Sequence, residues 1–237
     1  TFRPDMTTIV VIGDITPEEA RVAIEKDFGE WKAVGPKPQT DLQPVPRNPA
    51  TAQNVPDPTR IQDSVSLSEQ VPMNRFDPDY YALELGNHVL GGGFYATRLY
   101  RDLREKTGYV YFVSNALNAG RTRTVFSVNY GANPANVSKA NVLIIRNLRQ
   151  MQTSEPTPAE LQQAKALLLR QIPLAEASES SVARGLLSRA VMGLPLNEPA
   201  VAADRYFSLT GDQVRAAFEK AIRPDGFVQV VLGPPPQ

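Results

Sequence analysis

The most informative part of the chain is residues 90–114, which read LGGGFYATRLYRDLREKTGYVYFVS. It opens with three consecutive glycines, Gly91, Gly92 and Gly93. Such a run ends a helix and lets a second backbone, of a peptide or a neighbouring strand, pass close by. A phosphate-binding loop would instead follow a strand and carry Lys-Ser, Lys-Thr or a G-x-G-x-x-G pattern, and none of these is present. The glycines are therefore predicted to terminate a helix rather than to bind a nucleotide.

Arginine and tyrosine side chains cluster directly after the glycines. The cluster consists of Arg98, Arg101 and Arg104 at helical spacing, with Tyr100, Tyr109 and Tyr111 nearby. Guanidinium and phenol groups together can bind a carboxylate or polarise a carbonyl group. A solvated charged helix with i,i+4 pairs, for example Arg101 with Glu105, is the other interpretation. On composition alone, the solvated helix is favoured.

Hydrophobic periodicity and turn residues predict strands and helices on both sides of this stretch. Strands are expected at residues 7–12, 61–67, 110–117, 124–130 and 227–232. Helices are expected at 16–31, 77–90, 96–104, 133–151, 157–173, 180–192 and 212–222. Pro173 should bend or end the helix that contains it.

Residues 34–58 differ from their surroundings because they contain seven prolines and no apolar period. Such a composition is typical of an extended, semi-rigid linker. A long loop folded onto a domain remains the alternative, although loops of this length are uncommon inside compact domains.

Two segments of the chain resemble each other. Residues 2–13 read FRPDMTTIVVIG, and residues 222–233 read IRPDGFVQVVLG. Each places Arg-Pro-Asp before an apolar run that ends in glycine, which suggests two related domains that close with the same strand. Residues 1–33 would then be the C-terminal end of a preceding domain, residues 34–58 a linker, and residues 59–237 a second domain. A chance match is the alternative.

The composition narrows the function classes. The 237 residues include 25 basic and 25 acidic side chains, so the chain lacks the net positive charge of a dedicated nucleic-acid binder. No stretch of 18 apolar residues predicts a membrane span. The absence of cysteine excludes disulfides and thiolate metal sites, and leaves both the periplasm and the cytoplasm open as compartments. The single histidine, His88, excludes a multi-histidine metal site within this chain.

Residues 90–114 resemble the C-terminal domain of the M16 zinc metallopeptidases, the family of insulinase, pitrilysin and mitochondrial processing peptidase. In that family a glycine-rich turn leads into an S/T-R-L-y-x-x-L-R-E-K-x-G-x-x-Y segment. The matching positions are the glycine triplet, Thr97-Arg98-Leu99, Leu103-Arg104-Glu105-Lys106, Gly108 and Tyr111. The helix TPEEARVAIEKDFGEW and the order of helices and strands also fit, and weaker resemblance covers most of the chain.

This resemblance implies an α/β (α+β) sandwich in which helices cover one face of a mostly antiparallel sheet, as in the LuxS and processing-peptidase metallohydrolases. It also implies that two halves enclose a peptide, with zinc held by the other half. The second half contributes an arginine and, seven residues later, a tyrosine that bind substrate and stabilise the developing oxyanion. By position these are Arg104 and Tyr111, with Tyr109 as the reserve candidate and Gly91, Gly92 and Gly93 as further substrate-binding residues.

The family's inverted zinc motif, H-x-x-E-H, occurs nowhere in this chain. Residues 84–88 read ELGNH and stand where a duplicated domain could carry a decayed copy. Glu84 and His88 could contact one metal ion, but two ligands do not make a zinc site, so a core or surface histidine is the favoured interpretation. Asn87 would replace the general base, and an amide cannot take a proton from water at neutral pH.

Two functions remain after this reading. The chain is either the substrate-binding, non-catalytic half of a zinc peptidase or a proteolytically inactive structural and assembly subunit, with a stand-alone peptide binder as a weaker third idea. Retention of both Arg104 and Tyr111 favours the first function. The expected partners are a zinc-bearing half or subunit and a peptide, which an antiparallel sheet edge could bind as an added strand.

Overall fold

The computed structural model describes residues 2–92 and 95–234. The chain divides into two compact units, each of which is described by itself. Unit 1 comprises residues 1–41 and 170–203, and unit 2 comprises residues 42–169 and 204–237. The predicted site residues belong to unit 2.

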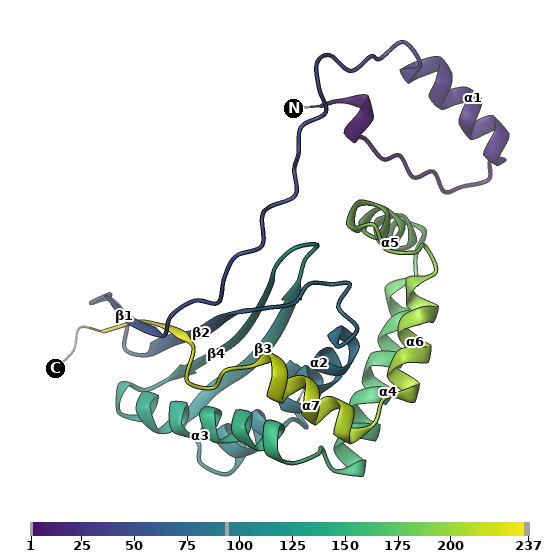
Figure 1. Cartoon of the computed structure of the whole chain (residues 1–237). Coiled ribbons are helices and arrows are strands. Elements are labelled where there is room, and N and C mark those ends of the chain that lie inside the picture. Colours follow the sequence, from purple (N-terminus) through teal and green to yellow (C-terminus); the bar gives the residue numbers. More distant parts are fainter. Residues whose placement is uncertain (1, 93–94, 235–237) are drawn as a thin grey trace. The chain divides into compact units, whose positions relative to one another are not determined.

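Unit 2 is built on a five-stranded sheet (Figure 1). Its strands are β1 (Thr51–Pro56), β2 (Asp63–Val71), β3 (Val110–Ala119), β4 (Thr124–Ala132) and β5 (Val228–Gly233). The order across the sheet is β1-β5-β2-β4-β3, with β1 parallel to β5 and the other neighbours antiparallel. The α+β architecture and the four strands predicted in this part of the chain are confirmed, whereas β1 was not predicted.

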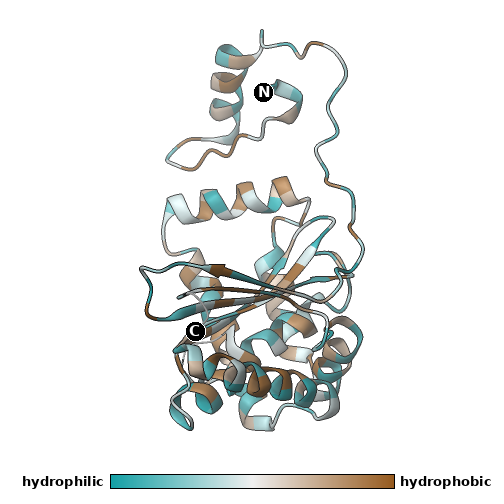
Figure 2. Ribbon diagram, turned by 90° about the vertical axis from the view of Figure 1, so that its left-hand side faces the viewer, coloured by the Kyte–Doolittle hydropathy of each residue, from teal (hydrophilic) through white to brown (hydrophobic). Residues whose placement is uncertain are grey.

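Helices cover one face of this sheet (Figure 2). They are α2 (Tyr80–Asn87), α3 (Pro134–Thr153) and α7 (Gly211–Ala221). The alternation of β2 explains why, because Val65 and Leu67 are buried under the helices while Ser66 and Ser68, on the other face, are only half-buried. Removal of these apolar side chains from water is the main force that holds the helices on the sheet.

Two further helices complete the C-terminal half, α4 (Pro158–Ala175) and α6 (Glu198–Ser208). α4 continues two residues past Pro173, where the sequence predicted a bend or an end. α6 was not predicted, because Pro195 and Pro199 at its start are typical of a turn or loop. α7 begins with a capping box between Thr210 and Gln213.

The linker predicted at residues 34–58 is wrong over its second half. Residues 42–50 belong to unit 2, and residues 51–56 form β1. Asn48 fixes this segment, since its Oδ1 accepts the backbone N–H of Gln70 at 2.7 Å and its Nδ2 donates to the carbonyl of Gly226 at 2.8 Å. The pairing of β5 with β2 ends at Ser68, so beyond that residue the side-chain amide of Asn48 replaces β5 as the hydrogen-bond partner of β2. Proline content did not reveal this pairing, because an edge strand tolerates proline at its end.

Unit 1 contains η1 (Pro4–Met6), α1 (Pro17–Phe28) and α5 (Glu179–Met192). α1, predicted at 16–31, begins with a capping box between Thr16 and Glu19. α5 ends at Gly193 in the left-handed conformation, with φ of 80°. The strand predicted at residues 7–12 is not formed, and the segment is extended with Ile9, Val11 and Ile12 well exposed. A strand needs a neighbour to pair its backbone, and no described strand lies beside this segment.

We expect Gly86→Ala to destabilise unit 2. Gly86 lies in α2 against α7, where an added Cβ would collide with the ring of Phe218 and the side chain of Val214. The overpacking should cost about 1–3 kcal/mol, more than the roughly 1 kcal/mol that alanine gains over glycine in a helix. Thermal unfolding followed by circular dichroism measures the effect.

The matched control is Gly185→Ala in α5, where an added Cβ would meet only the flexible end of Arg189, at 3.3 Å. This variant should be neutral or more stable. Equal destabilisation by both variants would contradict the packing argument.

Candidate functional site

The arginine-rich segment is a helical turn held in the core by its leucines. After a short helical start the turn is η3 (Tyr100–Glu105), a π-helix, a conformation often found at functional sites. Leu99 and Leu103 are fully buried. Their burial fixes the orientation of the intervening charged residues, so each arginine reaches a different environment.

Asp102 ties this segment to α3. Its buried carboxylate accepts hydrogen bonds from Arg101 and Lys106 on one oxygen, and from Arg146 and Asn147 of α3 on the other, at 3.0–3.2 Å. Burial alone would raise the pKa of Asp102, but the hydrogen bonds from Lys106, Asn147 and Arg101 hold it below its ordinary value. The carboxylate is therefore ionised and saturated, and it acts as a structural clamp.

Arg98 is also used for structure. Its guanidinium makes a bidentate pair with Glu160 at the start of α4, with N–O distances of 2.9 and 2.8 Å, and Arg98 is 7% exposed. Burial raises the pKa of Glu160, but the hydrogen bonds from Arg98 and from Thr157 outweigh it and lower this pKa to about 2. Arg101 pairs with Asp102 and Glu160, so the predicted Arg101–Glu105 pair is wrong.

Arg104 differs from the other two arginines. It is exposed, and no carboxylate in the described part of the chain pairs with it. Its Nη1 donates to the carbonyl of Val110 at 3.1 Å, which places the guanidinium against the backbone just before Tyr111. Gly108, with φ of 64°, provides the turn that brings the strand back to the helix. Four of the five guanidinium N–H groups stay available for a ligand.

Tyr111 projects from a β-bulge. The β3–β4 pairing shifts between Val110 and Phe112, so Tyr111 has no partner residue on β4. A bulge redirects its side chain, and the Tyr111 ring is 44% exposed while its hydroxyl donates to Oδ1 of Asn133 at 2.6 Å. The structure therefore brings Arg104 and Tyr111 to the same end of β3.

Tyr109, the reserve candidate, is more enclosed than Tyr111. It is half-buried, its N–H donates to the carbonyl of Leu103 at 3.0 Å, and Nζ of Lys139 lies 5.6 Å from its ring centroid. This position suits a ring that supports the turn and stacks a cation.

The glycine triplet has a packing reason that the sequence did not reveal. Gly91 and Gly92 lie in η2 (His88–Gly92), where an added Cβ would come within 2.5 Å of Asn115 and 2.7 Å of Asn87, respectively. Nδ2 of buried Asn115 donates to the backbone carbonyl of Asn87 at 3.1 Å and to its Oδ1 at 2.8 Å. Gly93 lies outside the described residues.

The described residues contain no group of three or more potential metal ligands. Glu84 and His88 approach to 3.4 Å on one helix turn, and both side chains are largely buried. Asn87 faces Asn115 rather than these two residues. The arrangement offers two ligands with no third, which does not fit a zinc site.

Comparison with known proteins finds similarity to one family. The family model described as peptidase M16 inactive domain matches residues 1–168. A crystal structure of a peptidase M16 inactive domain from Pseudomonas fluorescens is 28% identical, with a TM-score of 0.81 over 94% of this chain and 53% of that one. A protease from Helicobacter pylori superposes with a TM-score of 0.83 at 20% identity, over 94% and 54% of the two chains.

Among curated proteins, the one named probable inactive metalloprotease YmfF, from Bacillus subtilis, is 22% identical over 72% of this chain and 39% of its own length. The chain thus spans about half the length of the solved structures it matches, and less of the curated protein. In the described residues no helix is long and apolar enough to cross a membrane.

We expect Glu160→Gln to remove a pH-dependent part of the stability. The folded-state pKa of about 2 lies below the ordinary 4.5, so the stabilisation is complete above pH 4.5 and is lost as the pH falls toward 2. The linked free energy is on the order of 3 kcal/mol. Urea unfolding at pH 7, 4 and 3 measures it.

The control is Glu105→Gln, which removes an exposed carboxylate of the same motif. The unfolding free energy of this variant should change with pH in the same way as that of the wild type. If the unfolding free energy of Glu160→Gln also has the pH dependence of the wild type, the pair with Arg98 does not lower the pKa of Glu160.

Proposed function

This chain belongs to the peptidase M16 inactive domain family, and on that premise we propose that it is the substrate-binding, non-catalytic half of a zinc metallopeptidase. The described residues do not supply a zinc site, so in this proposal another half or subunit holds the zinc. The observation that carries the proposal is the pairing at one end of β3 of Arg104, which no described carboxylate engages, with the exposed Tyr111.

The two side chains suit a peptide carbonyl. The free N–H groups of Arg104 form a planar fork that donates to a carbonyl or carboxylate oxygen. The Tyr111 hydroxyl now donates to Asn133, and rotation of the phenol toward a substrate would redirect that donor. Donors of this kind stabilise negative charge that develops on oxygen when a peptide bond is attacked.

The face of the sheet opposite α2, α3 and α7 suits an extended peptide next to this pair. The pairing registers place 18 residues of the five strands on the face opposite the helices, and none of them is charged. They are mainly small polar or aliphatic residues: Thr51, Gln53, Val55, Ser64, Ser66, Ser68, Gln70, Phe112, Ser114, Ala116, Asn118, Val125, Ser127, Asn129, Gly131, Val228, Val230 and Leu232. Hydroxyl and amide groups can bind a peptide backbone whatever its side-chain charges.

We further propose that residues 1–33 are the C-terminal end of a preceding domain. Their apolar side chains are unusually exposed, with Val22 at 55% and Phe28 at 48% on α1. Exposed apolar surface of this kind marks a contact with another domain or subunit. The segment at residues 7–12 would then form its strand against that domain.

The test is peptide hydrolysis by the zinc-loaded assembly that contains this chain. Arg104→Ala and Tyr111→Phe should each lower kcat/KM by about 10²–10³-fold, the usual cost of losing one such donor. Tyr109→Phe should change it little, because that phenol supports the turn. Circular dichroism must show that the variants fold.

Arg149→Ala is the matched arginine control, since Arg149 is an exposed residue of α3 paired with Asp225. It should keep full activity. If Arg104→Ala and Tyr111→Phe also keep full activity, the site assignment fails. If the zinc-loaded assembly never cleaves peptides, the alternative of an inactive structural subunit replaces the proposal.

A further inference from the structure

We propose that a pocket beside Tyr111 binds a cationic side chain, lysine or arginine, of the bound peptide. The pocket has a volume of about 550 Å³ and lies where β1, β5 and the start of α3 meet. Its wall includes Asn54, Asp63, Asn133, Val137, Gln229 and Val231. The inference deepens the proposed function, because it names the class of residue that the peptide would present.

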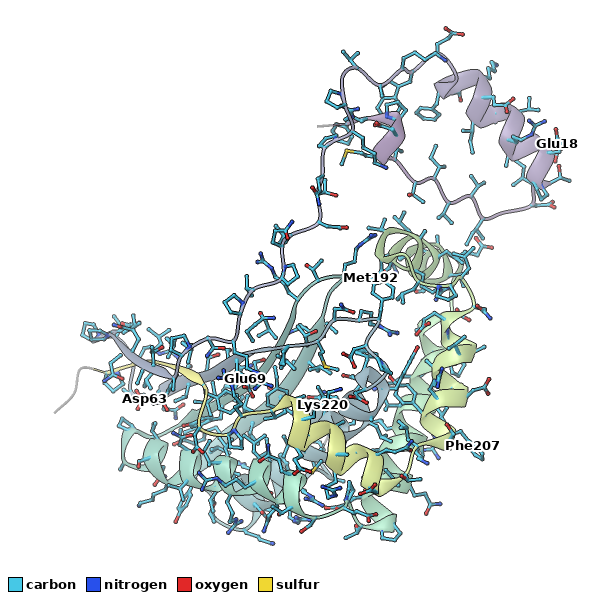
Figure 3. The ribbon with its side chains drawn as sticks, in the orientation of Figure 1. Glu18, Asp63, Glu69, Met192, Phe207 and Lys220 are labelled. Atoms are coloured by element: carbon cyan, nitrogen blue, oxygen red, sulfur yellow. The ribbon has the colours of Figure 1, made fainter. Side chains whose placement is uncertain are left out.

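Asp63 is the only charged residue among the twelve that line the pocket. It is the first residue of β2 and only 7% exposed, and it is labelled in Figure 3. Its carboxylate rests on Gly233, where any Cβ would collide with Oδ1. The glycine in the closing strand therefore makes room for the acid.

No described group pairs with the Asp63 carboxylate. The nearest relevant cation, Arg60, is committed elsewhere, since its Nη2 donates to Oγ of Ser64 at 2.6 Å. Burial raises the pKa of Asp63, and Arg60 offsets this only in part. A buried carboxylate without a partner is costly, and a cation that enters the pocket would remove that cost.

The start of α3 does not reverse this preference. A helix N-terminus carries about half a positive charge, whereas an ionised carboxylate carries a full negative one, so the pocket stays net negative. The amide oxygens next to the acid are partly used, because Asn133 Oδ1 accepts from Tyr111 and Gln229 Oε1 accepts from Asn141 at 3.0 Å. The carboxylate is therefore the main acceptor that remains for a ligand.

The pocket is continuous with the proposed site through Asn133. This residue lines the pocket and also accepts the Tyr111 hydroxyl at 2.6 Å. Asp63 shares the helix-covered face of Val65 and Leu67, so the pocket lies on the other side of the sheet from the polar face described above. A peptide held by Arg104 and Tyr111 would therefore place a side chain in the pocket by passing the end of the strands where Asn133 and Tyr111 lie. Val137 and Val231 offer apolar contact for the methylene groups of a long basic side chain.

The experiment is an NMR titration of this chain, without any zinc-bearing half, by acetylated and amidated Ala-Ala-X-Ala-Ala peptides. X is lysine, arginine, norleucine or glutamate. Lysine and arginine peptides should shift the amide signals of residues 54, 63, 133 and 229 and bind about tenfold or more tightly than norleucine, as expected for one charge-assisted hydrogen bond. The glutamate peptide should bind most weakly.

Two variants test the charge of Asp63 and the space of the pocket separately. Asp63→Asn should abolish the advantage of lysine over norleucine, and Ala135→Phe, which fills the pocket from the first turn of α3, should abolish binding while Asp63 stays in place. Asp225→Asn, an exposed acid outside the pocket, is the control. Thermal midpoints and the signals of β2 and β4 report on folding.

Equal affinity for lysine and norleucine peptides, or an unchanged lysine preference in Asp63→Asn, would overturn the inference. These results do not depend on peptide cleavage. If the lysine preference is absent but activity still depends on Arg104, only the pocket proposal fails. If the chain binds the lysine peptide but its assembly never cleaves peptides, only the proposed function fails.

Discussion

The hydrogen bonds to the buried carboxylate of Asp102 are the interaction on which the candidate site depends. Two bases of the same motif, Arg101 and Lys106, approach one oxygen, and Arg146 and Asn147 of α3 approach the other. The short helical turn of η3 could not hold its geometry by its own backbone hydrogen bonds, because helices of this length are unstable alone. The hydrogen bonds of the carboxylate instead connect the turn to the 20-residue helix α3. The backbone of Arg104, which belongs to the same turn, is held in place as a result.

This clamp explains why three arginines at helical spacing have three different roles. Arg98 faces Glu160 of α4, Arg101 bridges two carboxylates, and Arg104 is left for the strand that follows. The spacing alone predicted one solvated face, since periodicity describes a single helix and not the carboxylates brought by other elements. The family resemblance selected Arg104 and Tyr111, and the structure adds that they meet at one bulged strand end.

Local signals predicted most of the fold, and long-range pairing accounts for the failures. Capping boxes at Thr16 and Thr210 and the alternation of β2 are properties of a few neighbouring residues, and those elements were found. β1 was missed because its identity as a strand comes from β5, more than 170 residues away. The bulge at Tyr111 and the Asn87–Asn115 pair beneath the glycines depend on contacts across the sheet in the same way. Asp63 gave no signal either, since a single aspartate before an alternating strand is ordinary in sequence.

The significance of Asp63 emerges from comparison with three other buried or half-buried acids of unit 2. Asp102 and Glu160 each contact arginines that hold their pKa low. Glu69 is fully buried, and burial raises its pKa to about 7, yet its carboxylate still accepts the backbone N–H of Arg223 and lies 3.7 Å from that guanidinium. Asp102, Glu160 and Glu69 are thus each accompanied by a base from another element. Asp63 has no such base, and it lines a pocket of about 550 Å³ between the sheet and the start of α3, so a cation that enters this pocket would supply the missing partner.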